Sequence, residues 1–239
     1  MNSSKVKNNG GTPVKSCKFY FTLSVGLIML SSFAADDKVS ANSSWCESFD
    51  KVQSNGLPVG WSIEGKKWRV PVTQCTAKNS VLTVKCDRST GCIAIAVKNV
   101  DLNKTPVMRW RWRVMSYPQG ADGRLKNKDD QPIAIYLAMK DGAFSQTSLA
   151  YRWEGLTPKD YVGKTKYAGI LTVNYIVMRN QESKAGEWIT ETRNVAEDFK
   201  KYCGKIPTEF AVSINGNSQY TKSNTVAEID FIEFIPAGK

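Results

Sequence analysis

Arginines and apolar residues alternate through VMRWRWRVM (residues 107–115), and this stretch decides the fold. In an extended strand, side chains at every second position share one face. Burying two tryptophans stabilises the fold by several kcal/mol at ~25 cal/mol per Å², whereas burying three unpaired arginines costs more. We therefore expect Trp110 and Trp112 in the core and the arginines on an outer sheet face. The outward side chains are Arg109, Arg111 and Arg113.

A second stretch, PIAIYLAMK (residues 132–140), alternates large apolar residues with small residues and one tyrosine. Its isoleucines, Leu137 and Met139 are expected to pack against the two tryptophans between the sheets. The remaining side chains are then expected to lie beside the arginines on one outer face, where small residues and long cations would form a shallow groove. These side chains are Ala134, Tyr136 and Ala138.

The chain after Trp45 has the sequence pattern of an all-β protein, in which apolar or alternating runs are separated by turn-forming Gly, Pro, Asn, Asp and Lys. About ten such runs, including a short one over 65–72, predict an antiparallel β-sandwich of the jelly-roll type. One short capping helix is expected over 195–204, because its first turn is acidic and Gly204 ends it. The polar loop over 116–131 is long enough to suggest a functional role.

Residues 1–34 have the features of a secretory signal peptide. Four lysines precede an apolar run that ends at Ala34, a small residue suited to a cleavage site. An uncleaved membrane anchor is the alternative, but the run is shorter than the ~20 apolar residues that a spanning helix needs. We therefore expect cleavage, a linker over 35–44, one β-sandwich domain over 45–239, and a periplasmic or extracellular protein with no stable membrane span.

The chain contains no histidine, which excludes Ser-His-Asp and Cys-His catalysis and histidine metal ligands. Its formal net charge of +11 suits an anionic partner or simple solubility. No long block of like charges is present, so we expect no nucleic-acid partner. In an exported protein the mature cysteines predict at most two disulfides with one thiol left over. The pairing stays open among Cys46, Cys75, Cys86, Cys92 and Cys203.

Short motifs in a fixed order suggest a family. They are Trp110-Arg111-Trp112-Arg113-Val114, Asp129-Asp130 leading to Tyr136, Tyr151-Arg152-Trp153, Trp188, Arg193-Asn194-Val195, Asp198-Phe199 and Asn224-Thr225. In this order they resemble the bacterial exported family catalogued as domain of unknown function 3047, over nearly the whole mature chain. The resemblance implies a periplasmic or extracellular protein without an assigned activity. It also implies a galactose-binding-like jelly roll, as in carbohydrate-binding modules.

Our first hypothesis is a non-enzymatic protein that binds a saccharide or another polar or anionic ligand on the arginine-bearing face. Arginine forks suit carboxylate, sulfate and phosphate groups. The alternatives are a carboxylate-dependent hydrolase or lyase of cell-envelope polysaccharide, and a structural envelope protein whose arginines pair with carboxylates of the chain. Those carboxylates would be Asp129, Asp130, Glu154 and Asp198. The candidate ligand-binding residues are Arg109, Arg111, Arg113, Asp129, Asp130, Tyr136, Tyr151, Arg152, Arg193 and Asp198.

No cofactor is expected. Glu47 and Asp50 lie near the start of the domain, and Asp230 and Glu233 near its end. Jelly rolls pair their terminal strands and often hold a structural calcium there, for which carboxylate oxygens are suitable ligands. Plain solvated carboxylates are the alternative.

Overall fold

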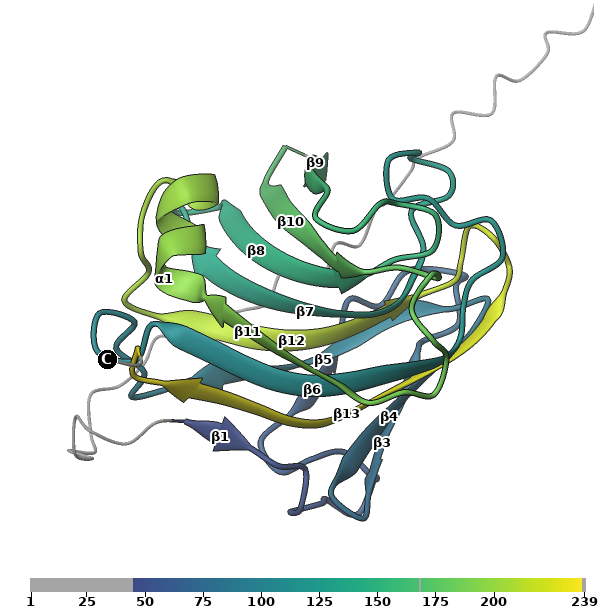
Figure 1. Ribbon diagram of the computed structural model, residues 1–239, viewed down its shortest axis with the longest axis horizontal. Helices are drawn as coiled ribbons and strands as arrows, with labels where there is room; N and C mark the ends of the chain where they lie inside the picture. Colours follow the sequence, from purple (N-terminus) through teal and green to yellow (C-terminus); the bar gives the residue numbers. More distant parts are fainter. Residues whose placement is uncertain (1–44, 168, 238–239) are drawn as a thin grey trace, which may run out of the picture.

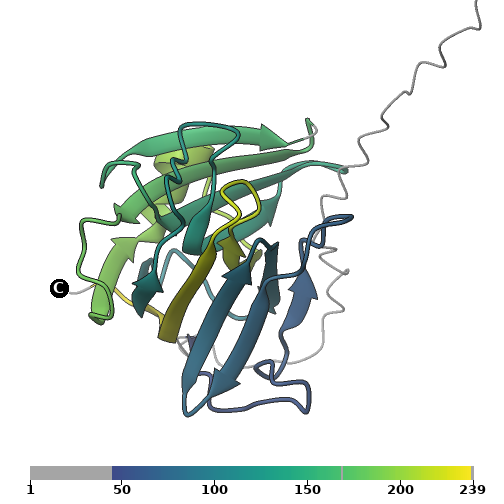
Figure 2. The ribbon, with the colours of Figure 1, turned by 90° about the vertical axis from the view of Figure 1, so that its right-hand side faces the viewer.

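The computed structural model describes residues 45–167 and 169–237, which form a sandwich of two β-sheets (Figure 1; Figure 2). The strands are β1 (Cys46–Glu47), β2 (Ser62–Glu64), β3 (Gln74–Lys78), β4 (Val81–Asp87), β5 (Thr90–Val97), β6 (Val107–Ser116), β7 (Gln131–Lys140), β8 (Gln146–Trp153), β9 (Val162–Tyr167), β10 (Leu171–Arg179), β11 (Ile189–Asn194), β12 (Phe210–Asn217) and β13 (Asn224–Ile235). The six-stranded sheet has the order β11-β6-β13-β4-β3, with β1 paired to β13. The seven-stranded sheet has the order β2-β5-β12-β7-β8-β10-β9.

The predicted fold class is confirmed. Strands β4, β5, β6 and β7 alternate between the two sheets, so the chain crosses the sandwich repeatedly, as in a jelly roll. Among the named strands of the described residues, every pair is antiparallel except β8 with β10. The structure adds short strands that the sequence pattern did not reveal, and the predicted strand over 65–72 is wrong. That segment is a turn instead, in which the Val70 N–H donates to the Lys67 carbonyl at 3.1 Å.

The core lies between the sheets, and the two tryptophans of β6 are at its centre. Trp110 and Trp112 are both 0% exposed, with ring centroids 5.4 Å apart in an edge-on arrangement. Trp112 also contacts Trp153 of β8 at 5.5 Å between centroids. The isoleucines, Leu137 and Met139 of β7 belong to the same buried cluster, so the predicted core packing is confirmed.

The prediction that the β6 arginines share a groove with Tyr136 is wrong. Strand β6 belongs to the six-stranded sheet, and β7 to the seven-stranded sheet. Because their apolar faces meet in the core, their outer faces point in opposite directions. The arginines therefore lie on one side of the molecule, and the face of Ala134, Tyr136 and Ala138 lies on the other.

The predicted helix forms where expected, as α1 (Val195–Asp198) followed by the π-helical turn η1 (Phe199–Cys203). Asn194 is its N-cap, and the Asn194 Oδ1 accepts from the Glu197 N–H at 3.2 Å. Gly204, with φ of 82°, ends it in the left-handed region. Phe199 is fully buried, so the helix caps one end of the sandwich (Figure 1).

All five cysteines of the described residues are free thiols, so the expected disulfides are absent from this part of the chain. Cys75, Cys86 and Cys92, which sequence spacing allowed to pair, lie on three successive strands and are buried there. Buried apolar surroundings suit a thiol, which packs as a small hydrophobic side chain.

No helix within the described residues is long and apolar enough to cross a membrane. The predicted signal peptide (1–34) and linker (35–44) lie outside those residues. Strand β1 pairs with β13, so the first and last described strands meet in the six-stranded sheet.

Candidate functional site

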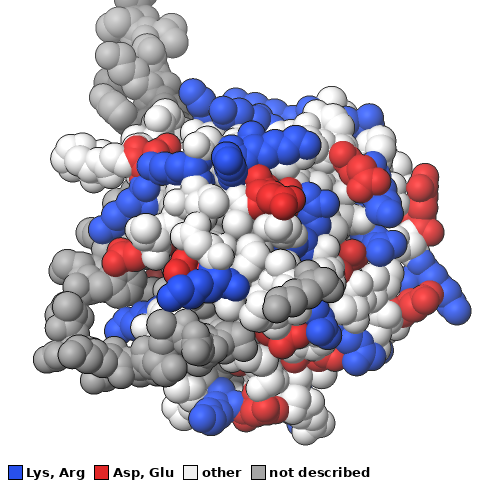
Figure 3. Space-filling model, turned by 60° about the vertical axis from the view of Figure 1, so that its left-hand side comes forward, with Lys and Arg blue, Asp and Glu red and all other residues white. Residues whose placement is uncertain are grey.

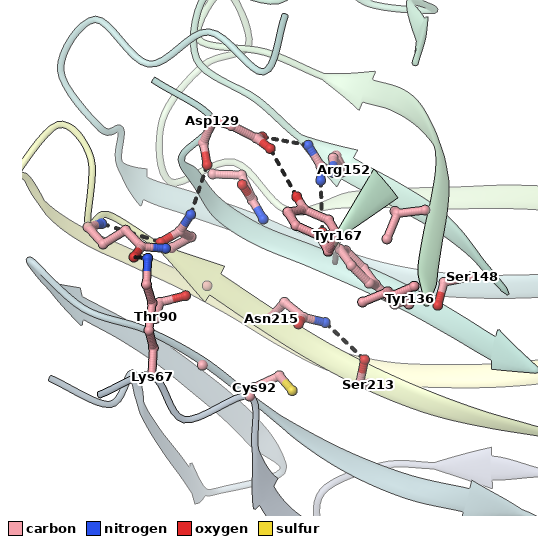
Figure 4. Close-up of a pocket in the computed structure, with 18 of the residues that line it drawn as sticks. Lys67, Thr90, Cys92, Asp129, Tyr136, Ser148, Arg152, Tyr167, Ser213 and Asn215 are labelled. Carbon is pink, nitrogen blue, oxygen red and sulfur yellow. Dashed lines mark hydrogen bonds and ion pairs between the residues drawn. The ribbon is translucent and has the colours of Figure 1, made fainter. Parts of the chain in front are cut away.

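A pocket of about 220 Å³ lies on the outer face of the seven-stranded sheet (Figure 4). Its floor is formed by alternate residues of β12, β7 and β8, whose other residues face the core. Small side chains such as Ala138 and Ser148 leave the space open. Tyr136, Tyr167 and Tyr220 supply aromatic surface around it.

Arg152 of β8 is the buried centre of this site, with 1% of its surface exposed. Its Nη1 lies 2.8 Å from Asp129 Oδ1 and 3.2 Å from Glu154 Oε1, so two carboxylates face one guanidinium. Its Nη2 donates to Tyr136 Oη at 2.9 Å, and its Cζ lies 4.0 Å from the centroid of the Tyr175 ring. The guanidinium therefore fixes the tyrosine of the pocket floor and has its own charge balanced.

Asp129 joins three elements around the pocket. Besides pairing with Arg152, its Oδ2 accepts from Tyr167 Oη of β9 at 3.3 Å. Its backbone carbonyl accepts from Asn217 Nδ2 of β12 at 2.8 Å. The long loop before β7 is thereby tied to both sides of the pocket (Figure 4).

Burial sets the protonation of these groups. It raises the pKa of Glu154 to about 7, an effect that Arg152 opposes and Asp129 reinforces. Burial also raises the pKa of Tyr136 and of Tyr167. Both tyrosines therefore present neutral hydroxyl groups at neutral pH.

Polar side chains line the β12 side of the pocket. Asn215 and Ser213 point from β12 into it, with Asn215 Nδ2 donating to Ser213 Oγ at 2.9 Å (Figure 4). Gln131, at the start of β7, is only 4% exposed, and its Oε1 has no hydrogen-bond partner among the described residues. A buried carbonyl oxygen without a partner is costly, so Gln131 reduces the stability of this part of the fold.

Asp130 positions the loop that carries Tyr220. Its carboxylate is fully buried and accepts from the N–H of Tyr220 at 3.0 Å and the N–H of Thr221 at 2.6 Å. The neighbouring Gln219 accepts from Lys67 Nζ at 2.7 Å. Asp130 therefore supports the pocket without lining it.

The β6 arginines lie far from this pocket, on the outside of the six-stranded sheet. Each faces a carboxylate of β13, at the positions that the antiparallel register brings opposite or next to it. The pairs are Arg109 with Glu233 at 3.4 Å, Arg111 with Asp230 at 3.2 Å, and Arg113 with Glu228 at 2.6 Å. On the side of the molecule drawn in Figure 3, basic groups are interspersed with acidic ones.

The carboxylates that pair with the β6 arginines belong to the chain, as the structural-protein alternative predicts. The particular carboxylates predicted from the sequence are wrong. Asp129 and Glu154 pair with Arg152, and Asp198 pairs with Arg193. The sequence could not identify β13 as the neighbour of β6, because the two strands are more than a hundred residues apart.

Tyr151, Arg193 and Asp198 form a separate cluster beneath the helix. The Asp198 carboxylate accepts from Tyr151 Oη at 2.7 Å and from Arg193 Nε and Nη2 at 2.9 and 2.6 Å. Tyr151 points into the core, where its ring lies 5.1 Å from that of Trp110. The three residues connect β8, β11 and the helix, and they do not line the pocket.

The carboxylates proposed for calcium have protein partners. Glu47 accepts from the Phe49 N–H and from Trp61 Nε1, both at 2.7 Å, and Asp50 accepts from Ser48 and Ser80. Asp230 and Glu233 pair with arginines of β6. No group of three or more metal-binding side chains occurs within residues 45–167 and 169–237.

Of the candidate residues, Asp129, Tyr136 and Arg152 therefore meet at the pocket. Sequence reasoning missed several further lining residues. One signal was available in β12, where polar Ser213, Asn215 and Asn217 alternate with apolar side chains. The missed lining residues are Lys67, Gln131, Gln146, Ser148, Tyr167, Ser213, Asn215, Asn217, Gln219 and Tyr220.

The fold and the pocket define a jelly-roll sandwich with a polar, tyrosine-lined cavity on one outer sheet face. The chain belongs to the family described as protein of unknown function (DUF3047), whose model matches residues 64–233. No curated protein matches the chain.

Several solved structures are similar at low identity. The xyloglucanase domain of NopAA, a type three effector from Sinorhizobium fredii, has a TM-score of 0.43 and 11% identity, covering 72% of this chain and 91% of that one. Endoglucanase 3 of Trichoderma harzianum, from family GH12, has a TM-score of 0.43 and 11% identity, with 83% and 100% covered. A family 29 carbohydrate-binding module has a TM-score of 0.37 and 10% identity, with 80% and 89% covered.

Proposed function

We propose that this protein binds a saccharide in the pocket on the outer face of the seven-stranded sheet. The observation that carries the proposal is that tyrosine rings and the polar side chains of β12 line the same pocket. A sugar ring has an apolar face that packs on an aromatic ring and a rim of hydroxyls that need hydrogen-bond partners. The amide and hydroxyl side chains of β12 offer both donors and acceptors for such a rim.

The pocket is held in place before any ligand arrives. Tyr136 is fixed by Arg152, Tyr167 by Asp129, and Tyr220 by the backbone bonds of its loop to Asp130. Ordered side chains lose little further freedom on binding, so more of the interaction energy appears as affinity. Asp129, Tyr136 and Arg152, which line the pocket, are thus proposed as site residues, and Asp130 is proposed as a support.

The arginine face gives less support to ligand binding. Its guanidinium groups already face Glu228, Asp230 and Glu233, so an anionic ligand would have to displace protein carboxylates. The pocket also favours binding over hydrolysis by two carboxylates across a cleft, which needs a separation of roughly 5–9.5 Å. Among the described residues that line the pocket, Asp129 is the one carboxylate.

We also propose that the protein is exported and acts in the periplasm or outside the cell. Lysines followed by an apolar run within residues 1–34 support this proposal. Fractionation of the native host, with the mature N-terminus determined by mass spectrometry, tests it. A cytoplasmic protein that retains residues 1–34 would contradict it.

A glycan array followed by calorimetry tests saccharide binding. We expect the wild-type chain to bind at least one oligosaccharide, and Tyr136→Ala and Gln131→Leu to weaken that binding by roughly tenfold or more. Gln74→Leu, an exposed substitution on the six-stranded sheet, is the matched control for Gln131→Leu. The proposal fails if no saccharide binds, or if both pocket variants bind as tightly as the wild type while remaining folded.

A further inference from the structure

Lys67 brings a positive charge to the pocket that the described residues do not neutralise. Its Nζ donates to Gln219 Oε1, a neutral acceptor, at 2.7 Å. It also lies 5.6 Å from the centroid of the Tyr220 ring. No carboxylate of the described chain lies within 4.0 Å of it. An ammonium has three donors, so this half-buried group keeps donors for a ligand.

The second cation of the pocket differs in this respect. Arg152 is paired with both Asp129 and Glu154, so its charge is balanced within the protein. Lys67 follows β2 and lies on the β5 side of β12, whereas Arg152 lies on the β8 side (Figure 4). Within the described part of the chain, the pocket therefore has a cation paired with carboxylates at one side and a cation without a carboxylate partner at the other.

We infer that the saccharide carries an anionic group and that this group binds at Lys67. The inference rests on the proposed saccharide binding and names the class of sugar. A lysine ammonium attracts any oxyanion as a point charge, so a uronate carboxylate and a sugar sulfate share the required chemistry. The tyrosines and the β12 amides would hold the ring while Lys67 selects for charge.

Matched pairs of saccharides test this inference. The probes are oligomers of galacturonate, glucuronate and mannuronate, each beside its carboxyl-reduced form, and a sulfated galactan oligomer beside its desulfated form. Binding to all of them is measured by calorimetry at low and high salt. The proteins are the wild type, Lys67→Gln, Lys67→Arg and the control Lys78→Gln, which removes an exposed charge at the end of β3 on the other sheet.

The expected result is that the wild type binds one acidic member roughly tenfold more tightly than its neutral counterpart. Lys67→Gln should remove that difference, Lys67→Arg should keep most of it, and Lys78→Gln should leave it unchanged. Salt should weaken the acidic member selectively, because screening acts on the ion pair. Whether the uronates or the sulfated galactan show the preference distinguishes the two sources of the anion.

Two results would overturn the inference in different ways. If neutral saccharides bind the wild type as tightly as their acidic counterparts and Lys67→Gln changes neither, the charge selection is wrong while saccharide binding stands. If neither these probes nor any saccharide on the array binds, the proposed function falls and the inference falls with it.

Discussion

Gly163 and Tyr175 face each other across β9 and β10, and the tyrosine ring fills the space that a side chain at position 163 would need. A Cβ added to Gly163 would lie 2.1 Å from Tyr175 Cζ, far inside contact distance. The same ring packs against the guanidinium of Arg152. The absence of a side chain on β9 thus allows an aromatic ring to lie over the strand and to support the buried arginine of the pocket.

We expect Gly163→Ala to destabilise the fold by about 2 kcal/mol or more, because the ring or the edge strand must move. The urea concentration at the midpoint of unfolding measures this loss of stability. In a Tyr175→Ala background the same substitution should cost far less, since the clashing ring is gone. Equal costs in both backgrounds would show that the close approach of Gly163 to Tyr175 is not the cause.

The arginine ladder on the opposite face is expected to contribute to stability and not to saccharide binding. Arg113 makes the closest pair, with both Nε and Nη2 within 2.7 Å of Glu228 Oε2. Arg113→Ala should cost up to about 1 kcal/mol, and less in high salt. Arg109→Ala should reduce stability by less, because the Arg109–Glu233 pair is longer and more exposed. Urea unfolding and calorimetry check this, and a loss of saccharide affinity in Arg113→Ala would contradict it.

Local alternation was sufficient to predict the core. The two-residue repeat of β6 places Trp110 and Trp112 on the same face. Burying that face is far more favourable than burying the arginines, so the opposite orientation of the strand is excluded. The order of the strands in each sheet could not be predicted from alternation, because alternation does not indicate which distant strands pair. Strands β6 and β13 are such a pair. The error about the shared groove arose there, since β6 and β7 are consecutive in the chain but belong to different sheets.

The pocket was predictable only in part, for the same physical reason. The motifs predict Arg152 and Tyr136 as site residues, but Lys67 and Tyr220 reach the pocket from segments that connect the two sheets, β2 to β3 and β12 to β13. Residues 65–72 carry an apolar pattern typical of a strand, yet Arg69 has a φ of 59° and the chain turns there. A local pattern describes which face a strand residue occupies, not which loop ends next to it.

The thiols should react in an order set by burial. Cys46 is exposed, whereas burial raises the pKa of Cys92 to about 12 and lowers its reactivity. We expect a maleimide to label Cys46 rapidly in the native protein, and Cys75, Cys86 and Cys92 only after unfolding. Peptide mass spectrometry locates the label, and Cys46→Ser is the control. A native mass that shows paired cysteines would contradict the free thiols of the structure.

The buried carboxyl of Glu154 should make the stability of the protein fall as pH rises through neutrality. Burial holds its pKa near 7 in the folded state, above its ordinary value of 4.5, despite the opposing charge of Arg152. Between these two values the folded chain binds a proton that the unfolded chain has released, so raising the pH favours unfolding. The effect reaches up to about 3 kcal/mol, and it is complete once the pH exceeds the folded pKa.

Other carboxyls titrate in the opposite direction, so the contribution of Glu154 is isolated by a difference. Its neighbours Arg152, Asp129 and Thr157 remain in place in Glu154→Gln, which keeps a hydrogen-bonding side chain of the same shape. Urea unfolding from about pH 5 to about pH 8 should show the wild type losing stability relative to this variant. Glu187→Gln, which removes an exposed carboxylate, should leave the wild-type profile unchanged. If the stabilities of the wild type and Glu154→Gln change in parallel with pH, then Glu154 is ionised throughout this pH range. Burial would then not raise its pKa, and the prediction would be wrong.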